Sequence, residues 1–300
     1  ICSKNTESIA IEAIENHPEM KLRMDDFSSF RINWNDKASN IKSICKELNL
    51  GFDSVVFLDD SASERERVKT EIKEILVPDF PSDPRFLPSF LNDLNCFDNF
   101  SFTEEDKLRK KSYKNRKDQI ELIDSKDQKS IDEWINSLNI EILVEKLNSK
   151  NLPRTTQLLN KTNQMNLTTR RLNGDEIQAW ADEDSNRLWT FRVNDKFGEF
   201  GLTGIASMKV SNETAEIIDF VLSCRVMGKK IENSILSFLI EQARSYGAKT
   251  IYAKYKLTKR NHPCKLFLDN SGLMQEKENL FSFDLSRDFK SSKSAKIDLI

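Results

Sequence analysis

The run Val55-Val56-Phe57-Leu58-Asp59-Asp60 decides the fold of the first part of this chain. Four consecutive apolar residues predict a buried strand over residues 54–58, and the two acids mark its carboxyl end. Paired carboxylates at the carboxyl end of a buried strand are the usual way in which an α/β protein holds Mg²⁺ against a phosphate. We therefore expect Asp59 and Asp60 to be metal ligands.

Helices and strands alternate on both sides of that strand. Apolar spacing predicts helices over residues 7–15 and 37–48, and a third helix that begins near Ser63, where Ser63 and Glu66 fit a capping box. This alternation is typical of a parallel sheet. Because proline disrupts helices and central strands, we expect the chain to leave its first domain, without a helix, at a cluster of four prolines: Pro78, Pro81, Pro84 and Pro88.

Composition excludes several classes of protein. The chain has 300 residues, enough for roughly two domains, and its formal net charge of −2 argues against a dedicated nucleic-acid binder. Its five cysteines form no Cys-x-x-Cys pair, which fits reduced thiols and a cytoplasmic location. No apolar run approaches the length that spans a membrane. The chain begins with Ile1 at what we interpret as the end of a strand, so we expect a fragment of a longer protein.

Two polar residues precede Asp59 at positions that suit a phosphate site. Ser3 follows the predicted end of one strand, and Lys37 opens a helix before the next strand. A hydroxyl, an ammonium and a carboxylate pair together bind phosphate, balance its charge and anchor a metal. Taken singly, these residues could be a helix cap, a solvated lysine and an acidic turn. Their order along the chain favours the phosphate site.

The sequence around these residues resembles the FkbH-like proteins of the haloacid dehalogenase (HAD) superfamily, subfamily IIIC. The matching runs are residues 1–5, 30–37, 57–61 and 163–171, and the resemblance extends to about residue 273. It implies a Rossmann-like HAD domain over residues 1–98 that lacks its first strand. The Asp-x-Asp run that supplies the aspartate nucleophile of that superfamily, followed by Thr or Val, is absent from this chain.

The same resemblance implies roles for the residues of the first site. Ser3 would hydrogen-bond the phosphate, Lys37 would stabilise its charge, and Asp59 and Asp60 would hold Mg²⁺. A thioester on a cysteine suits acyl transfer. Cys2 is therefore a candidate nucleophile, because cationic neighbours are expected to favour its thiolate. The alternative is that Cys2 is a small buried hydrophobic residue.

A second candidate site lies in the run Arg225-Val226-Met227-Gly228-Lys229-Lys230, between a strand predicted over residues 214–224 and a helix. This run resembles the acyl-CoA loop of the GNAT acetyltransferases. The resemblance implies a GNAT-like α/β acyltransferase domain over residues 136–300, after a charged helical linker over residues 99–135.

The residues expected to bind coenzyme A, or the phosphopantetheine arm of a carrier protein, are Arg225, Gly228, Lys230 and Asn261. The N–H groups of a helix amino terminus favour a pyrophosphate, and Gly228 lets the backbone approach it closely. The family pattern has Gly or Ala where Lys230 stands. This lysine adds bulk where backbone should meet the ligand.

We therefore predict two α/β domains and three alternative functions. The first is an FkbH-like phosphatase or glyceryl transferase, which dephosphorylates 1,3-bisphosphoglycerate or a similar small molecule and loads an acyl carrier protein in polyketide-type or other specialised biosynthesis. The second is a GNAT-type N- or O-acyltransferase that uses acyl-CoA. The third is a non-catalytic module that docks a carrier protein. Arg170 and Arg171 are either ordinary surface residues or contacts to an acidic carrier protein.

Overall fold

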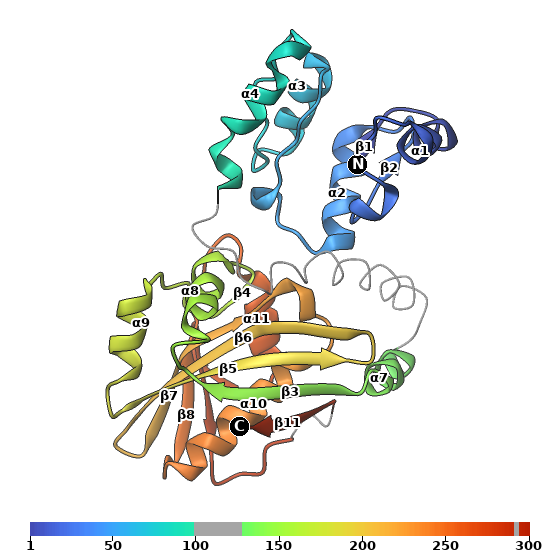
Figure 1. Ribbon diagram of the computed structural model, residues 1–300. Helices are drawn as coiled ribbons and strands as arrows, with labels where there is room; N and C mark the ends of the chain where they lie inside the picture. The colour runs from blue at the N-terminus through green and yellow to red at the C-terminus, as the bar shows by residue number, and fades with distance from the viewer. Residues whose placement is uncertain (99–127, 291–293) are drawn as a thin grey trace. The chain divides into compact units, whose positions relative to one another are not determined.

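A computed structural model describes residues 1–98, 128–290 and 294–300, which belong to two compact units (Figure 1). The first unit contains residues 1–98 and the second contains residue 128 and those that follow. Most of the predicted linker lies outside the described residues. Its last part is helix α7, Gln128–Ser137, in the second unit. Both units combine helices with strands, so the predicted α/β class is confirmed.

The first unit places helices around short parallel strands. Strands β1 (Cys2–Ser3) and β2 (Arg31–Ile32) pair in parallel. The helices are α1 (Glu7–Asn16), α2 (Lys37–Leu48), α3 (Ala62–Glu71) and α4 (Leu87–Asn92), with short 3₁₀ turns at Met24–Asp26, Phe52–Ser54, Pro84–Phe86 and Asn95–Phe97. The apolar face of α2 packs against α3 and the residues around it to form a small core: Ala38, Ile41, Cys45, Phe57, Val68, Ile72 and Ile75.

Three local expectations differ from the structure. The strand over residues 54–58 is reduced to a parallel bridge between Val56 and Leu76, because a 3₁₀ turn takes up the preceding residues. Helix α3 is capped by Ser61 rather than Ser63, and the Ser61 hydroxyl accepts a hydrogen bond from the Glu64 N–H at 3.4 Å. Helix α4 contains Pro88, which costs no intrahelical hydrogen bond in the first turn of a helix.

In the described part of the second unit, nine strands form one sheet. Their order is β11-β3-β5-β6-β7-β8-β10-β9, and β4 pairs with β7. The pairs β3–β11 and β7–β8 are parallel, and the others are antiparallel. The strands are β3 (Ile140–Lys146), β4 (Met165–Asn166), β5 (Asn186–Asp195), β6 (Gly198–Ser211), β7 (Thr214–Leu222), β8 (Thr250–Lys254), β9 (Met274–Lys277), β10 (Leu280–Asp284) and β11 (Ala295–Leu299).

Helices cover both faces of this sheet. Leu188 of β5 packs in one cluster with α8 (Leu152–Lys161) and α9 (Gly174–Ala181). The next residue, Trp189, packs in another cluster with α10 (Ile231–Ser245) and α11 (His262–Asp269). Because successive side chains of a strand point to opposite faces, these two sets of helices lie on opposite faces. None of the helices in the described ranges has the length and apolar character needed to cross a bilayer.

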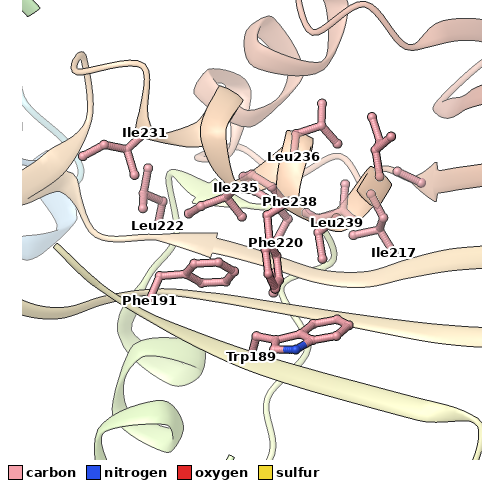
Figure 2. Close-up of a cluster of buried hydrophobic side chains, with 14 of the residues drawn as sticks. Trp189, Phe191, Ile217, Phe220, Leu222, Ile231, Ile235, Leu236, Phe238 and Leu239 are labelled. Atoms are coloured by element: carbon pink, nitrogen blue, oxygen red, sulfur yellow. The ribbon is translucent and has the colours of Figure 1, made fainter. Parts of the chain in front are cut away.

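Helix α10 provides the centre of the larger core, as its sequence pattern predicted. Phe238 makes edge-to-face contacts with Trp189 and Phe191, with ring centroids 5.5 and 5.7 Å apart (Figure 2). Such aromatic pairs contribute about 0.5–1.5 kcal/mol beyond the area that they bury. This packing fixes the helix against the sheet and, with it, the loop that precedes the helix.

The parallel strands β7 and β8 stay paired over only part of their length. Their pairing ends at Ile217 and Ala253, while β7 continues to Leu222 and pairs there with β4. A register shift between β6 and β7 adds an extra residue to β7 near Asp219. A bulge of this kind bends a strand and re-aims the residues that follow. The chain then leaves the sheet through the loop that joins β7 to α10.

Candidate functional site

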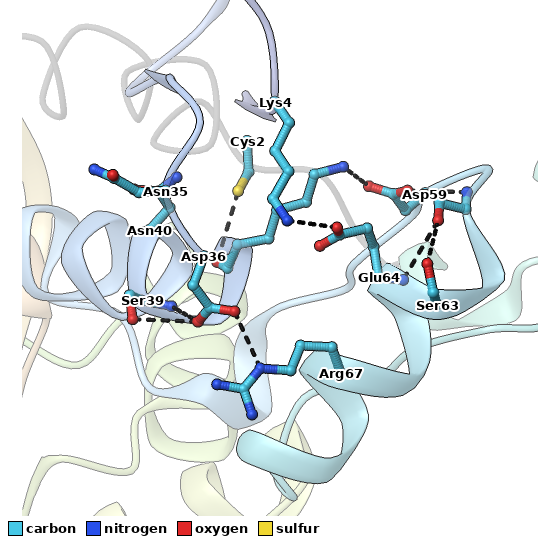
Figure 3. A network of polar contacts seen from close by, with 12 residues as sticks. Cys2, Lys4, Asn35, Asp36, Ser39, Asn40, Asp59, Ser63, Glu64 and Arg67 are labelled. Carbon is cyan, nitrogen blue, oxygen red and sulfur yellow. Dashed lines mark hydrogen bonds and ion pairs between the residues drawn. The ribbon is translucent and has the colours of Figure 1, made fainter.

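An ion pair between Lys37 and Asp59 lies at the centre of the first site (Figure 3). The Lys37 Nζ and the Asp59 Oδ2 are 2.5 Å apart, and the two side chains are 10% and 6% exposed. Lys37 is the first residue of α2, because the Asp36 carboxylate accepts a hydrogen bond from the Ser39 N–H at 3.0 Å and caps the helix. The second Asp59 oxygen accepts from the Ser61 N–H at 3.0 Å. The cap therefore fixes the backbone of Lys37, and a backbone N–H group holds the Asp59 carboxylate.

The end of β1 lies beside this pair. The Ser3 carbonyl accepts a hydrogen bond from the Asn33 N–H at 3.0 Å. The next residue, Lys4, donates from Nζ to the Glu64 Oε1 at 2.6 Å. Cys2 also reaches α2, because its Sγ lies 3.7 Å from the Lys37 carbonyl oxygen. The structure thus brings together three segments that the sequence predicted to share one site.

Asp60, the next residue in the chain after Asp59, is exposed. Its carbonyl oxygen accepts a hydrogen bond from the Arg65 Nη1 at 2.9 Å, which fixes the backbone of the turn. Among the described residues, no group of three or more His, Cys, Asp and Glu side chains is placed to hold a metal. Mg²⁺ needs no such cage, because it keeps several waters and binds one or two carboxylates together with substrate phosphate oxygens. Asp59 and Asp60 supply the type of ligand that this pattern uses, and their binding of Mg²⁺ stays a prediction.

Cys2 departs from the expectation drawn from its neighbours. Burial raises the pKa of the Cys2 thiol, and the Lys37 ammonium opposes this effect without cancelling it. The thiolate predicted from the sequence is therefore disfavoured, and a neutral thiol lies beside Lys37.

We expect alkylation to show this directly. In the native full chain at pH 7, Cys2 should react with iodoacetamide more slowly than Cys96, whose side chain is exposed. The Cys2 rate should keep rising beyond the ordinary thiol pKa, because the thiolate is the reactive form and burial raises the pKa of Cys2. Peptide mass spectrometry across a pH series measures both rates in one sample. A Cys2 rate that is already at its plateau at pH 7 contradicts the expectation.

The loop of the second site contains two residues in the left-handed region of backbone conformation. Gly228 has φ +83° and Lys230, which precedes α10, has φ +56°. A side chain at Gly228 would meet open space but would be strained by that φ. Within the described residues, no acceptor is recorded for the backbone N–H groups of Gly228, Lys230 and Ile231. These groups are available to an anionic ligand at the start of the helix.

The two lysines of this loop point their charges at acids of the same unit. The Lys229 Nζ is 2.7 Å from the Asp195 Oδ2, in a pair whose side chains are 3% and 0% exposed. The Lys230 Nζ is 2.6 Å from the Asp132 Oδ1 of α7. The bulk expected from Lys230 is thus held against α7. Anion binding by this loop would therefore rest mainly on the backbone.

The other two residues predicted for this site are buried. The Arg225 backbone N–H and Nε both lie near the Ser223 hydroxyl, at 3.5 and 3.4 Å. The Asn261 amide is used within the unit: its oxygen accepts from Tyr255 and Thr258, and its nitrogen donates to backbone carbonyls. Asn261 therefore fixes the loop before α11, and its contact with a cofactor stays a prediction.

Arg170 belongs to an interior network that the sequence left open. It donates two hydrogen bonds to the buried Asp219 carboxylate, at 2.8 and 2.5 Å, and its guanidinium lies 4.6 Å from the centre of the Trp180 ring. The Ser207 hydroxyl donates to the same carboxylate at 2.5 Å. Asp219 interrupts the apolar run of β7, and this was the sequence feature that could have indicated a buried partner for an arginine. For Arg171, burial and, to a smaller extent, the charge of Arg260 lower the pKa of the guanidinium.

Comparisons with known proteins give neighbours among solved structures. No protein-family model matches the chain, and no curated protein matches it. Among solved structures, the N-terminal part of protein BF1531 from Bacteroides fragilis, which contains a phosphatase domain complexed with Mg, is 46% identical over 34% of this chain, with a TM-score of 0.33. The match spans 27% of that chain, so this protein covers about a quarter of its neighbour's length.

Acetyltransferases are the other structural neighbours. The ribosomal-protein-S18-alanine N-acetyltransferase from Escherichia coli is 8% identical over 50% of this chain and 97% of its own, with a TM-score of 0.38. The spermidine N-acetyltransferase from Vibrio cholerae, in complex with CoA and spermine, is 15% identical over 49% of this chain and 96% of its own, with a TM-score of 0.39. The named neighbours are thus enzymes of two kinds, a phosphatase domain and acetyltransferases.

Proposed function

We propose that the first unit is the phosphate-binding part of an FkbH-like, HAD-type phosphatase or glyceryl transferase. The observation that carries this proposal is the buried Lys37–Asp59 pair, which lies beside the end of β1. In such a pair, the Lys37 ammonium can turn from Asp59 to a phosphate, and the Asp59 carboxylate, with Asp60, can then bind a metal ion. The match of 46% identity to a phosphatase domain supports the same class of chemistry.

In this proposal, four residues of the first unit bind the phosphate or the metal ion. Lys37 balances the negative charge of the phosphate, and the Ser3 hydroxyl donates a hydrogen bond to one of its oxygens. Asp59 and Asp60 hold Mg²⁺, which when bound supplies a further positive charge against the phosphate. Such groups act strongly because they are already oriented in a site with little water. Asp59 also keeps the Lys37 ammonium in place before the substrate arrives.

The substrate that we propose is 1,3-bisphosphoglycerate or a similar phosphorylated acid, whose acyl group passes to an acyl carrier protein. In this proposal, Cys2 accepts the acyl group first, before the group passes to the carrier protein. Its sulfur forms a bond to the acyl carbon, the thiol proton passes to solvent, and the bond from that carbon to the phosphate oxygen breaks. The raised pKa of Cys2 makes this step more favourable at higher pH.

The test uses the full chain with 1,3-bisphosphoglycerate, Mg²⁺ and a carrier protein. We expect phosphate release above the background rate and a glyceryl adduct on the carrier by mass spectrometry. Asp59→Asn should reduce phosphate release by at least about 100-fold, the usual loss when one preorganised charge is removed. Lys42→Ala, in an exposed pair with Glu71, is the matched control and should leave the rate unchanged. An unmodified carrier under all conditions rejects the transferase proposal.

Acyl-CoA binding by the loop before α10 is the second candidate function. The favouring observation is the set of N–H groups at Gly228, Lys230 and Ile231 without recorded acceptors in the described residues. We expect calorimetry to detect CoA binding and Gly228→Val to weaken it by at least about tenfold, because a side chain disfavours the φ of +83° that shapes the loop. Gly247→Val, at another glycine with positive φ, is the matched control. Failure of the wild-type protein to bind CoA removes this candidate.

A further inference from the structure

We propose that a cavity at one end of the sheet in the second unit binds a small organic carboxylate with an apolar body. The cavity has a volume of about 400 Å³. It is lined by the end of β3, the start of β5, the last part of α9 and Tyr246, which follows α10. Concave sites of this size are typical of small-molecule binding.

The cavity is separate from both candidate sites described above. None of the residues assigned to the phosphate site or to the loop before α10 lines it. That loop meets α10 at Ile231, whereas Tyr246 follows the last residue of the helix, Ser245. A helix of 15 residues is about 22 Å long, so the loop and the cavity lie at opposite ends of α10. The proposed carboxylate is therefore a further ligand, not the phosphate or the coenzyme A considered above.

Strand pairing places two cations on one face of the sheet at this cavity. Lys146 is the last residue of β3 and pairs directly with Trp189 of β5. Arg187 precedes Trp189 by two positions on β5, so the side chains of Lys146, Arg187 and Trp189 project from the same face. The backbones of such diagonal neighbours are about 7–8 Å apart. One carboxylate between Lys146 and Arg187 can therefore accept hydrogen bonds from both.

Neither cation is committed to an acid of the chain. In the described ranges, no ion pair is recorded for Lys146 or Arg187. The Arg187 Nη1 donates to the Asp184 and Asn186 carbonyls at 2.6 and 2.7 Å, and the guanidinium lies 4.7 Å from the centre of the Tyr246 ring. These contacts hold the guanidinium at the cavity wall. Its Nε and Nη2 have no recorded acceptor among the described residues, and a guanidinium edge of this kind matches the two oxygens of a carboxylate.

The charge of the lining selects a carboxylate over a phosphate. Asp182 is the acidic residue of the lining, and its Oδ1 accepts a hydrogen bond from the Gln178 Nε2 at 2.8 Å. With the cations Lys146 and Arg187, the lining side chains carry a net charge of +1. A carboxylate balances that charge, whereas a phosphate monoester carries about −1.5 to −2 at pH 7 and would also face the Asp182 carboxylate.

Apolar walls account for the rest of the proposed ligand. Leu147, Leu188 and the rings of Trp189 and Tyr246 line the cavity beside the charged groups. The Trp189 ring is held in place by its edge-to-face contact with Phe238 (Figure 2). Such walls favour an apolar body, because binding removes apolar surface of both partners from water.

The experiment measures the affinity of the full chain for three probes of one shape by ligand-observed NMR titration: 3-phenylpropionate, its neutral amide and the cation 3-phenylpropylamine. We expect the carboxylate to bind at least about tenfold more tightly than the other two. Lys146→Gln and Arg187→Gln should each weaken its binding by about tenfold, because each removes a charge-assisted hydrogen bond. Ala181→Leu, which fills part of the cavity, should weaken binding similarly. Urea unfolding followed by tryptophan fluorescence checks that each variant is folded.

Lys150→Gln is the matched control. It removes an exposed lysine that follows Lys146 by four positions and does not line the cavity, so the affinity should not change. The titrations require neither phosphate release nor CoA binding, so their outcome is separate from that of both candidate functions. Three results overturn the proposal: no binding of 3-phenylpropionate by wild type, equal binding of its amide, or unchanged affinity in both charge variants. Tighter binding of inorganic phosphate than of 3-phenylpropionate overturns it as well.

Discussion

Lys37→Met is expected to destabilise the first unit by about 3–5 kcal/mol and to reduce phosphate release to background. The methionine leaves the Asp59 carboxylate almost completely buried with no opposite charge, and the loss of that partner costs more than the net contribution of the pair. The effect on phosphate release has a separate cause, because Lys37 is the cation that faces the proposed phosphate. Unfolding in urea, followed by hydrogen exchange on peptides from residues 1–98, measures the stability of this unit alone.

A double replacement isolates the buried charge from the lost side chain. Lys37→Met combined with Asp59→Leu should recover most of the stability, because it removes both charges at once. Phosphate release should stay at background in the double variant, since both site residues are gone. Lys42→Ala gives the scale for an exposed pair, for which about 0–1 kcal/mol is usual. If Lys37→Met costs no more than Lys42→Ala, the pair is not buried as described.

Lys229→Met is expected to destabilise the second unit by about 3–5 kcal/mol, because it leaves a buried carboxylate without its opposite charge. The Lys229–Asp195 pair is less exposed than the Lys37–Asp59 pair. The pair with Asp195 joins the loop before α10 to the end of β5, and the Lys229 ammonium also lies 4.0 Å from the centre of the Phe200 ring. Removing the lysine leaves the Asp195 carboxylate without its cation. Tryptophan fluorescence during urea unfolding, measured with Trp34→Phe also in place, reports on this unit, since Trp134, Trp180 and Trp189 all belong to it.

Lys230→Met is the matched control for that experiment. The two lysines are neighbours in sequence and each pairs with an aspartate, but the Lys230–Asp132 side chains are 36% and 47% exposed. Solvent screens such a pair, so its loss should cost less than about 1 kcal/mol. A similar loss in both variants contradicts the assignment of burial. CoA binding should survive Lys230→Met, because the ammonium is held against α7 and the backbone supplies the contacts.

Much of the local structure could be predicted from the sequence because it depends on near neighbours. Helix α2 has the predicted bounds, since Asp36 caps it and its apolar residues repeat every three to four positions. The apolar face of α10 follows from the same periodicity. Helix boundaries were less predictable where two nearby residues could each cap the helix. Ser61 rather than Ser63 caps α3, because Ser61 follows the turn that Asp59 fixes.

The sequence by itself determined the α/β class and the helices with clear periodicity, because these depend on residues a few positions apart. Only the tertiary structure decided which charges meet. Lys37 pairs with a residue 22 positions away, and Lys230 with one 98 positions away. It also buried Asn261 and left Trp34 in water. Burial and long-range pairing depend on how the elements pack, and local sequence patterns carry no record of that packing.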